Sequence, residues 1–191
     1  MHPIDLSALR RPGRYRIVVG GAVDAASPPF RVAGGGALFR RLAGDTVRFF
    51  QAQRDGAHVP ALLDRKPSHL TDRRATVYDT PVFTGDGGDV PAEPLRPIGG
   101  PVDVEGGWFD AGDFVKFTHA TAYSLAELLL VRRDLDRHDR ALDAETRHGL
   151  RWLDKMWDQR RKVLYVQVGL GTGSEEFGFL GDHDVWRLPE A

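Results

Sequence analysis

Apolar side chains recur at helical spacing in three segments of the chain. Residues 36–53, 118–135 and 140–158 each carry apolar residues three and four positions apart, as helices with a buried face do. The segment 118–135 is apolar over most of its circumference, which is typical of a helix packed on several sides. The pattern therefore predicts a mainly α fold.

Short stretches with strand character flank these helices. In residues 14–19 every second residue from Tyr15 is apolar, and a second apolar patch at 30–32 follows turn residues. We expect a hairpin here and a further short strand at 163–168. Because an isolated hairpin is marginally stable in water, residues 1–33 are expected to be the edge of something larger.

Residues 55–107 differ in character from the rest of the chain. Proline and glycine are frequent there, above all from Pro81 to Pro101. We expect a long irregular connection. Loops of such length inside a compact domain are uncommon and tend to be functional or disordered, so this one favours a site close to it.

Composition narrows the classes of partner. Of 191 residues 28% are charged, and the net charge of −1 does not favour binding to nucleic acid or to an acidic membrane. The chain has no cysteine, which excludes disulfides and thiolate metal sites. It has no apolar run of about 18 residues, and its N-terminus lacks the pattern of a secretory signal, so localisation stays undetermined.

The stretch EGGWFDAGDFVKF holds the candidate chemistry. Asp110 and Asp113 are three residues apart, Gly112 between them permits backbone geometries that other residues resist, and Trp108 offers a flat apolar face. Sugars are bound by such combinations, since their C–H faces stack on aromatic rings and their hydroxyls need acceptors. The alternative is that one of the two aspartates caps a helix that begins near Phe117.

The stretch GGWFDAGDFVKF also resembles the signature of glycoside hydrolase family 9, the inverting cellulases and related β-glucanases. FFQAQRDG and RKPSHLTD before it, and RWLDKMWD, LYVQVG and GDHDVWRLPE after it, resemble further segments of that family in the same order. The resemblance covers about residues 36–190. It implies that 34–191 is the truncated opening part of an α/α toroid of six helical hairpins, and that 1–33 is the C-terminal remnant of an immunoglobulin-like β-sandwich domain.

The resemblance also implies a mechanism and a substrate. Asp113 would be the general base that deprotonates water, Asp110 would help to hold that water, and His183, Trp186 and Trp108 would bind a β-1,4-glucan. The general acid of the family is a glutamate from a segment beyond this chain, so the chain alone is expected to be inactive. Two alternatives stay open: a degenerate relative that only binds carbohydrate, and a helical interaction module unrelated to sugar.

The resemblance raises two metals, calcium and zinc, and the segments of the family's calcium sites cannot be located in this chain. Relatives with the immunoglobulin-like domain often carry a structural zinc on cysteines and histidines, but the corresponding positions here are Asp55, Ser68 and His69, with His58 nearby. Zinc's usual soft ligands are missing. We therefore expect no zinc, no other metal and no cofactor, and a β-glucan as the partner.

Overall fold

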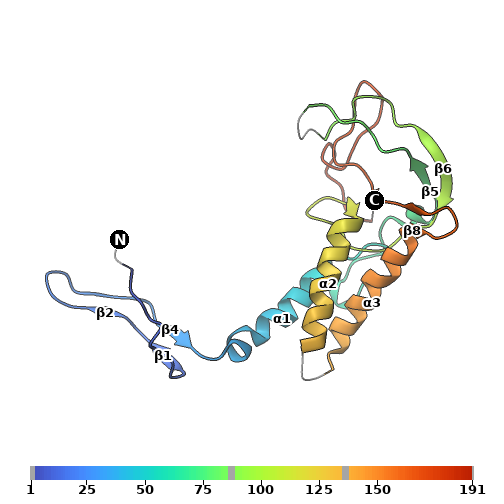
Figure 1. The fold of residues 1–191 in the computed structure, drawn as a ribbon. Coiled ribbons are helices and arrows are strands. Elements are labelled where there is room, and N and C mark those ends of the chain that lie inside the picture. Colours follow the sequence, from blue (N-terminus) through green and yellow to red (C-terminus); the bar gives the residue numbers. More distant parts are fainter. Residues whose placement is uncertain (1–2, 86–88, 135–137, 191) are drawn as a thin grey trace. The chain divides into compact units, whose positions relative to one another are not determined.

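The computed structural model describes residues 3–85, 89–134 and 138–190 (Figure 1). The chain forms two compact units, Met1–Thr46 and Val47–Ala191, and the division falls inside α1 (Gly35–Ala52). The sequence predicts a domain boundary earlier, after residue 33. The immunoglobulin-like origin of the residues before that point stays a prediction.

The first unit contains the expected hairpin as two short antiparallel pairs. β1 (Gly13–Tyr15) pairs with β4 (Phe30–Val32), and β2 (Val18–Val19) pairs with β3 (Ala25–Ala26). Tyr15 lies opposite Phe30, with ring centroids 6.3 Å apart. Such cross-strand aromatic pairs stabilise a hairpin, so the alternation of apolar residues predicted this element correctly.

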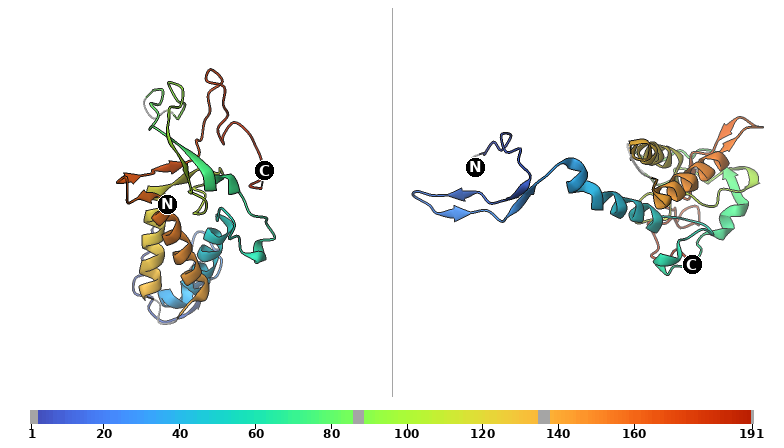
Figure 2. Two further views of the ribbon diagram at one scale, coloured as in Figure 1. Left: turned by 90° about the vertical axis from the view of Figure 1, so that its right-hand side faces the viewer. Right: turned by 90° about the horizontal axis from the view of Figure 1, so that it is seen from below.

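The three predicted helices are present, and each end lies within three residues of the expected one. α2 (Thr118–Asp134) and α3 (Arg140–Lys155) follow α1 and lie side by side (Figures 1 and 2). α3 begins where the Asp139 carboxylate accepts the amide hydrogens of Ala141 and Leu142, as an N-cap does. Among the described residues, no helix has the length and apolarity that crossing a membrane would require.

Apolar side chains from all three helices meet in one core. Its buried members come from the C-terminal end of α1, from α2, from α3 and from the loop before α2: Val47, Trp108, Leu125, Leu128 and Leu142. Phe50 packs on this cluster, and its ring centroid is 5.1 Å from that of Trp108. The core therefore fastens the loop that carries the two aspartates to the helices.

A second buried cluster joins α3 to the neighbouring strands. It consists of Val104, Trp152 and Met156, and the Trp152 indole donates a hydrogen bond to the Val104 carbonyl at 3.0 Å. Gly107 has a φ of +80°, and a Cβ at this position would lie 2.6 Å from the Trp152 ring. Only glycine allows this approach of the loop to α3.

The prediction that residues 55–107 form an irregular connection is wrong in part. It contains two short 3₁₀ turns, η1 (Ala61–Leu63) and η2 (Leu70–Arg74), and a bulged antiparallel pair of strands, β5 (Ala75–Tyr78) and β6 (Pro97–Val102). The prolines and glycines of β6 are atypical of a strand, so the sequence pattern did not predict it. Proline is tolerated because each strand of a two-stranded sheet has a free edge, where the missing amide hydrogen is not needed for pairing.

The expected strand at 163–168 changes partner halfway. β9 (Val163–Leu164) pairs with β8 (Trp157–Asp158), whereas β10 (Gln167–Val168) pairs with β7 (Lys116–Phe117). β10 therefore places the residues that follow it beside the segment just after the two aspartates.

Candidate active site

The loop with the two aspartates is bent, not helical, and it is tied to the end of α1. The Phe109 amide donates to the Gln53 carbonyl at 2.8 Å, and the Gln53 side-chain amide donates to the Ala111 carbonyl at 2.6 Å. One step further, the Asp55 amide donates to the Gly107 carbonyl at 2.9 Å. These bonds hold the loop on both sides of Asp110.

Asp113 points its carboxylate toward a histidine 70 residues later in the chain. Its Oδ2 is 2.9 Å from Nε2 of His183, and its Oδ1 accepts the Val115 amide hydrogen at 3.3 Å. The side chain keeps 17% of its surface exposed. α2 starts at Thr118, and neither of these two partners is an amide of its first turn. The helix-cap alternative is therefore wrong for Asp113.

Backbone contacts hold His183 at this distance. Its amide donates to the Gly171 carbonyl at 2.7 Å, and a Cβ on Gly171 would lie 2.6 Å from Cε1 of the imidazole ring. The hydrogen bond to Asp113 and the negative charges of Asp113 and Asp89 raise the pKa of His183. His183 is therefore more readily protonated than an isolated histidine, and a protonated ring donates from both nitrogens.

The other predicted site residues on the surface are Asp110 and Trp186. Asp110 is exposed, and its backbone amide donates to the Val115 carbonyl at 2.9 Å. Trp186 is 88% exposed. Gly112 faces open space and its φ lies outside the left-handed region, so the backbone does not require glycine at this position.

Trp108 lies elsewhere than expected. Only 4% of its surface is exposed, its ring belongs to the helical core, and its indole nitrogen donates to Glu145 Oε1 at 3.1 Å. A ring enclosed on both faces has no face open to a sugar, so this burial contradicts the predicted substrate contact. The sequence could not separate the two roles, because glycine and aromatic residues next to an acid suit a core position as well as a cleft.

A buried ion pair between Arg54, two residues after α1, and Glu145 of α3 supports Trp108. Glu145 is fully buried and accepts two hydrogen bonds from Arg54, at 2.9 Å and 2.6 Å. Two parallel bonds between a guanidinium and a carboxylate fix orientation as well as distance. The arrangement holds the segment just after α1 against α3 around Trp108.

His148 makes the stability of this region depend on pH. It is buried, and its Nε2 lies 2.8 Å from the Gly107 carbonyl, so the neutral tautomer with a hydrogen on Nε2 donates to it. Burial lowers the pKa of His148 to about 4. The folded state therefore binds fewer protons than the unfolded state between about pH 4 and the ordinary value near 6.5.

We expect this site to contribute about 3 kcal/mol of stability that is present above pH ~6.5 and lost as the pH falls through about 4. Urea unfolding between pH 4 and 7 measures it. His148→Gln, which keeps a side-chain donor, should flatten the pH dependence in this window. His119→Gln removes an exposed histidine as the matched control and should leave the profile unchanged. Equal profiles for both variants would contradict the assignment.

The residues in place of the expected zinc ligands form a different network. Asp55 accepts hydrogen bonds from Ser68 at 2.7 Å and from Lys116, and His69 Nδ1 is 3.2 Å from its Oδ1. Burial alone would raise the pKa of Asp55, but the bonds from His69, Lys116 and Ser68 and the lysine charge lower it to about 2. An ammonium bonded to the carboxylate repels a divalent cation, so these residues do not fit zinc.

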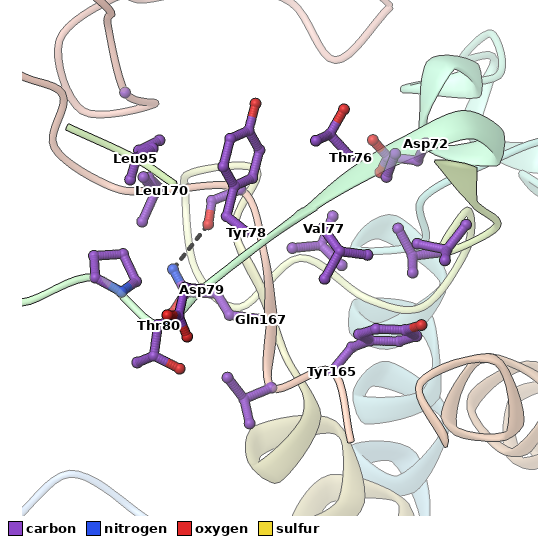
Figure 3. A pocket seen from close by; sticks show the side chains of 18 of the residues that line it. Asp72, Thr76, Val77, Tyr78, Asp79, Thr80, Leu95, Tyr165, Gln167 and Leu170 are labelled. Carbon is purple, nitrogen blue, oxygen red and sulfur yellow. Dashed lines mark hydrogen bonds between the residues drawn. The ribbon is translucent and has the colours of Figure 1, made fainter. Parts of the chain in front are cut away.

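A hollow of about 700 Å³ lies between β5, the segment 163–170 and residues 179–182. Tyr78, Tyr165 and Gln167 are among its walls (Figure 3). Asp110, Asp113 and His183 do not line it. The hollow is therefore distinct from the pair that Asp113 makes with His183.

Sequence reasoning missed two residues next to this pair. Asp89 and Thr172 come from segments 83 positions apart, and the Thr172 hydroxyl donates to Asp89 Oδ2, which faces His183. Neither belongs to a motif in the sequence. Only the packing of the two segments could reveal them.

The comparisons with known proteins agree on one family. The model described as glycosyl hydrolase family 9 matches residues 39–191. A cellodextrinase from Butyrivibrio fibrisolvens is 33% identical over 129 residues, which are 65% of this chain and 19% of the relative. Endoglucanase 17 from Oryza sativa subsp. japonica is 33% identical over 92 residues, 47% of this chain and 17% of the relative.

A solved structure extends the likeness to the fold. The Zn-binding triple mutant of the family 9 endoglucanase J30 superposes with a TM-score of 0.62 at 26% identity, over 85% of this chain and 31% of that one. The chain thus spans less than a third of this solved relative, and about a fifth of each curated relative is matched.

Proposed function

Because this chain belongs to glycosyl hydrolase family 9, we propose that it forms part of an enzyme that hydrolyses β-1,4-glucan. The names of the relatives, a cellodextrinase and an endoglucanase, support this substrate class. Residues 34–191 are then the opening part of the α/α toroid. The observation that carries the proposal is the partly exposed Asp113 carboxylate, held 2.9 Å from His183 on a loop that is hydrogen-bonded to Gln53.

Asp113 acts as the general base in this proposal. Its carboxylate takes a proton from a water molecule while the water oxygen forms a bond to the anomeric carbon. The glycosidic oxygen leaves on the opposite face and takes a proton from a carboxylic acid. Because the water attacks the face opposite to the leaving oxygen, the configuration at the anomeric carbon is inverted. Asp110, exposed on the same loop, accepts a second hydrogen bond from the attacking water.

The proton donor is proposed to be a glutamate outside residues 1–191. Glu175 and Glu176, exposed in the loop after β10, are not assigned to this role. Trp186, 88% exposed, offers a stacking face for a sugar ring, and His183 borders the site with its Nε2 directed at Asp113. Trp108 has no part in sugar binding in this proposal, because its ring is buried.

The anomeric form of the first product tests the proposal. The whole protein should release α-anomers from cellooligosaccharides, observed by proton NMR before mutarotation, while residues 1–191 alone should release no reducing sugar. Initial formation of β-anomers would overturn inversion. Binding of cellooligosaccharides without turnover by the whole protein would favour the degenerate carbohydrate-binding relative, and no binding at all would favour an interaction module.

A further inference from the structure

Asp89 lies on the side of His183 that faces away from Asp113. Its Oδ2 is 3.5 Å from Nδ1 of the imidazole, whose other nitrogen is 2.9 Å from Asp113. The ring thus has a carboxylate at each nitrogen. Beside Asp89, the Thr84 amide donates to the Val90 carbonyl at 2.9 Å and the Ala92 amide to the Val82 carbonyl at 2.8 Å.

Residues 171–172 bind both His183 and Asp89 by hydrogen bonds. The Gly171 carbonyl accepts the His183 amide hydrogen, and the next residue, Thr172, donates its hydroxyl to Asp89. The lack of a side chain on Gly171 leaves space for the imidazole. The segment 171–172 therefore fixes the positions of His183 and Asp89 relative to each other.

We propose that Asp89 is a positioning residue for the reaction, which acts through His183 to hold the Asp113 carboxylate in place. This rests on the proposed role of Asp113 as the base. Asp89 faces Nδ1 and Asp113 faces Nε2, so the ring is held between two carboxylates while Nε2–H donates to Asp113. Without Asp89, the Nδ1 side of the ring loses the carboxylate that fixes its orientation, and the imidazole can turn away from Asp113. The Asp113 carboxylate then loses the partner that keeps it in position.

The charges around His183 fit this role. Asp89, Asp113 and Asp184 all contribute negative charge close to the ring. Asp184 already accepts the amide hydrogens of Gly173 and Gly181, at 2.7 Å and 2.8 Å, so its carboxylate is held in the loop. Asp89 and Asp113 are the two carboxylates within hydrogen-bonding or ion-pair distance of the ring nitrogens among the described residues.

Titration of His183 by NMR tests the contact without any need for activity. The Cε1–H signal of His183, assigned by its loss in His183→Gln, should titrate at a lower pH in Asp89→Asn than in the wild type, because the negative charge that favours the protonated ring is gone. Thr172→Val, which releases Asp89, should shift it in the same direction. Glu176→Gln removes the same charge from an exposed position of the 171–184 loop and should leave the signal unchanged.

Kinetics of the whole protein separate positioning from mere contact. Asp89→Asn should lower kcat about tenfold, because small displacements of a catalytic group have large effects, and should leave KM within about twofold. The proposal is overturned if Asp89→Asn titrates like Glu176→Gln, or if the shift occurs and kcat does not change. If the wild-type protein has no activity on glucans, the proposed function fails by itself, while the NMR result still reports the contact.

Discussion

Replacement of Asp113 by Asn is expected to lower kcat on β-1,4-glucan by about 10²- to 10⁴-fold, the usual contribution of a general base. The amide has nearly the same shape but cannot accept the proton of the attacking water. His183 can still bond to the amide oxygen, so the loop should stay in place. KM should change little, because substrate binding does not need the proton acceptor. Steady-state kinetics on cellooligosaccharides measure both constants.

One control variant and one rescue experiment make this result specific. Asp103→Asn removes an exposed carboxylate that pairs with Lys155 at 3.0 Å, and it should keep kcat within about twofold. Azide attacks the anomeric carbon without losing a proton, so it should restore turnover of Asp113→Asn as α-glycosyl azide. A loss of less than tenfold, or no response to azide, would remove Asp113 from the role of base.

The second large effect concerns stability. Lys116→Met should lower the free energy of unfolding by about 3–5 kcal/mol, because it leaves the fully buried Asp55 carboxylate without its ammonium partner. Lys116 also bonds to Asp72 at 2.8 Å, so that carboxylate loses a partner as well. Denaturant unfolding of the whole protein at pH 7 measures the difference.

The expected pH dependence identifies the cause. In the wild type, the pKa of Asp55 is about 2 in the folded state, below its ordinary value, so its stabilising contribution is present above pH ~4 and lost as the pH falls through about 2. In Lys116→Met the carboxylate should prefer its proton, and lowering the pH toward 4 should reduce the deficit relative to wild type.

The controls for Lys116 remove comparable groups. Arg133→Met deletes a cation from an exposed pair with Asp134 at 2.7 Å, and it should cost less than about 1 kcal/mol. Asp55→Asn combined with Lys116→Met removes both buried charges and should recover part of the loss. A deficit for Lys116→Met no larger than that of Arg133→Met would show that the buried charge is not what stabilises this region.

Local pattern in the sequence determined a large part of the architecture. The periodicity of apolar residues predicted α1, α2 and α3 and the hairpin of β1 and β4, because helices and strands obey repeats of 3.6 and 2 residues wherever one face is buried. The stretch that includes Asp110 and Asp113 resembled the family signature closely enough to name the family, and the family match confirms it. The roles of Asp113 as base and of Asp110 as water-holder stay predictions.

Only the tertiary structure decided which residues meet. The pairing of β5 with β6 was hidden by prolines, and the burial of Trp108 depended on how three helices close around it. Asp113 reaches His183 across 70 positions, and Lys116 reaches Asp55 across 61. A sequence pattern reports the faces of single elements, whereas these contacts arise when separate elements pack, and no local repeat encodes the distance between them.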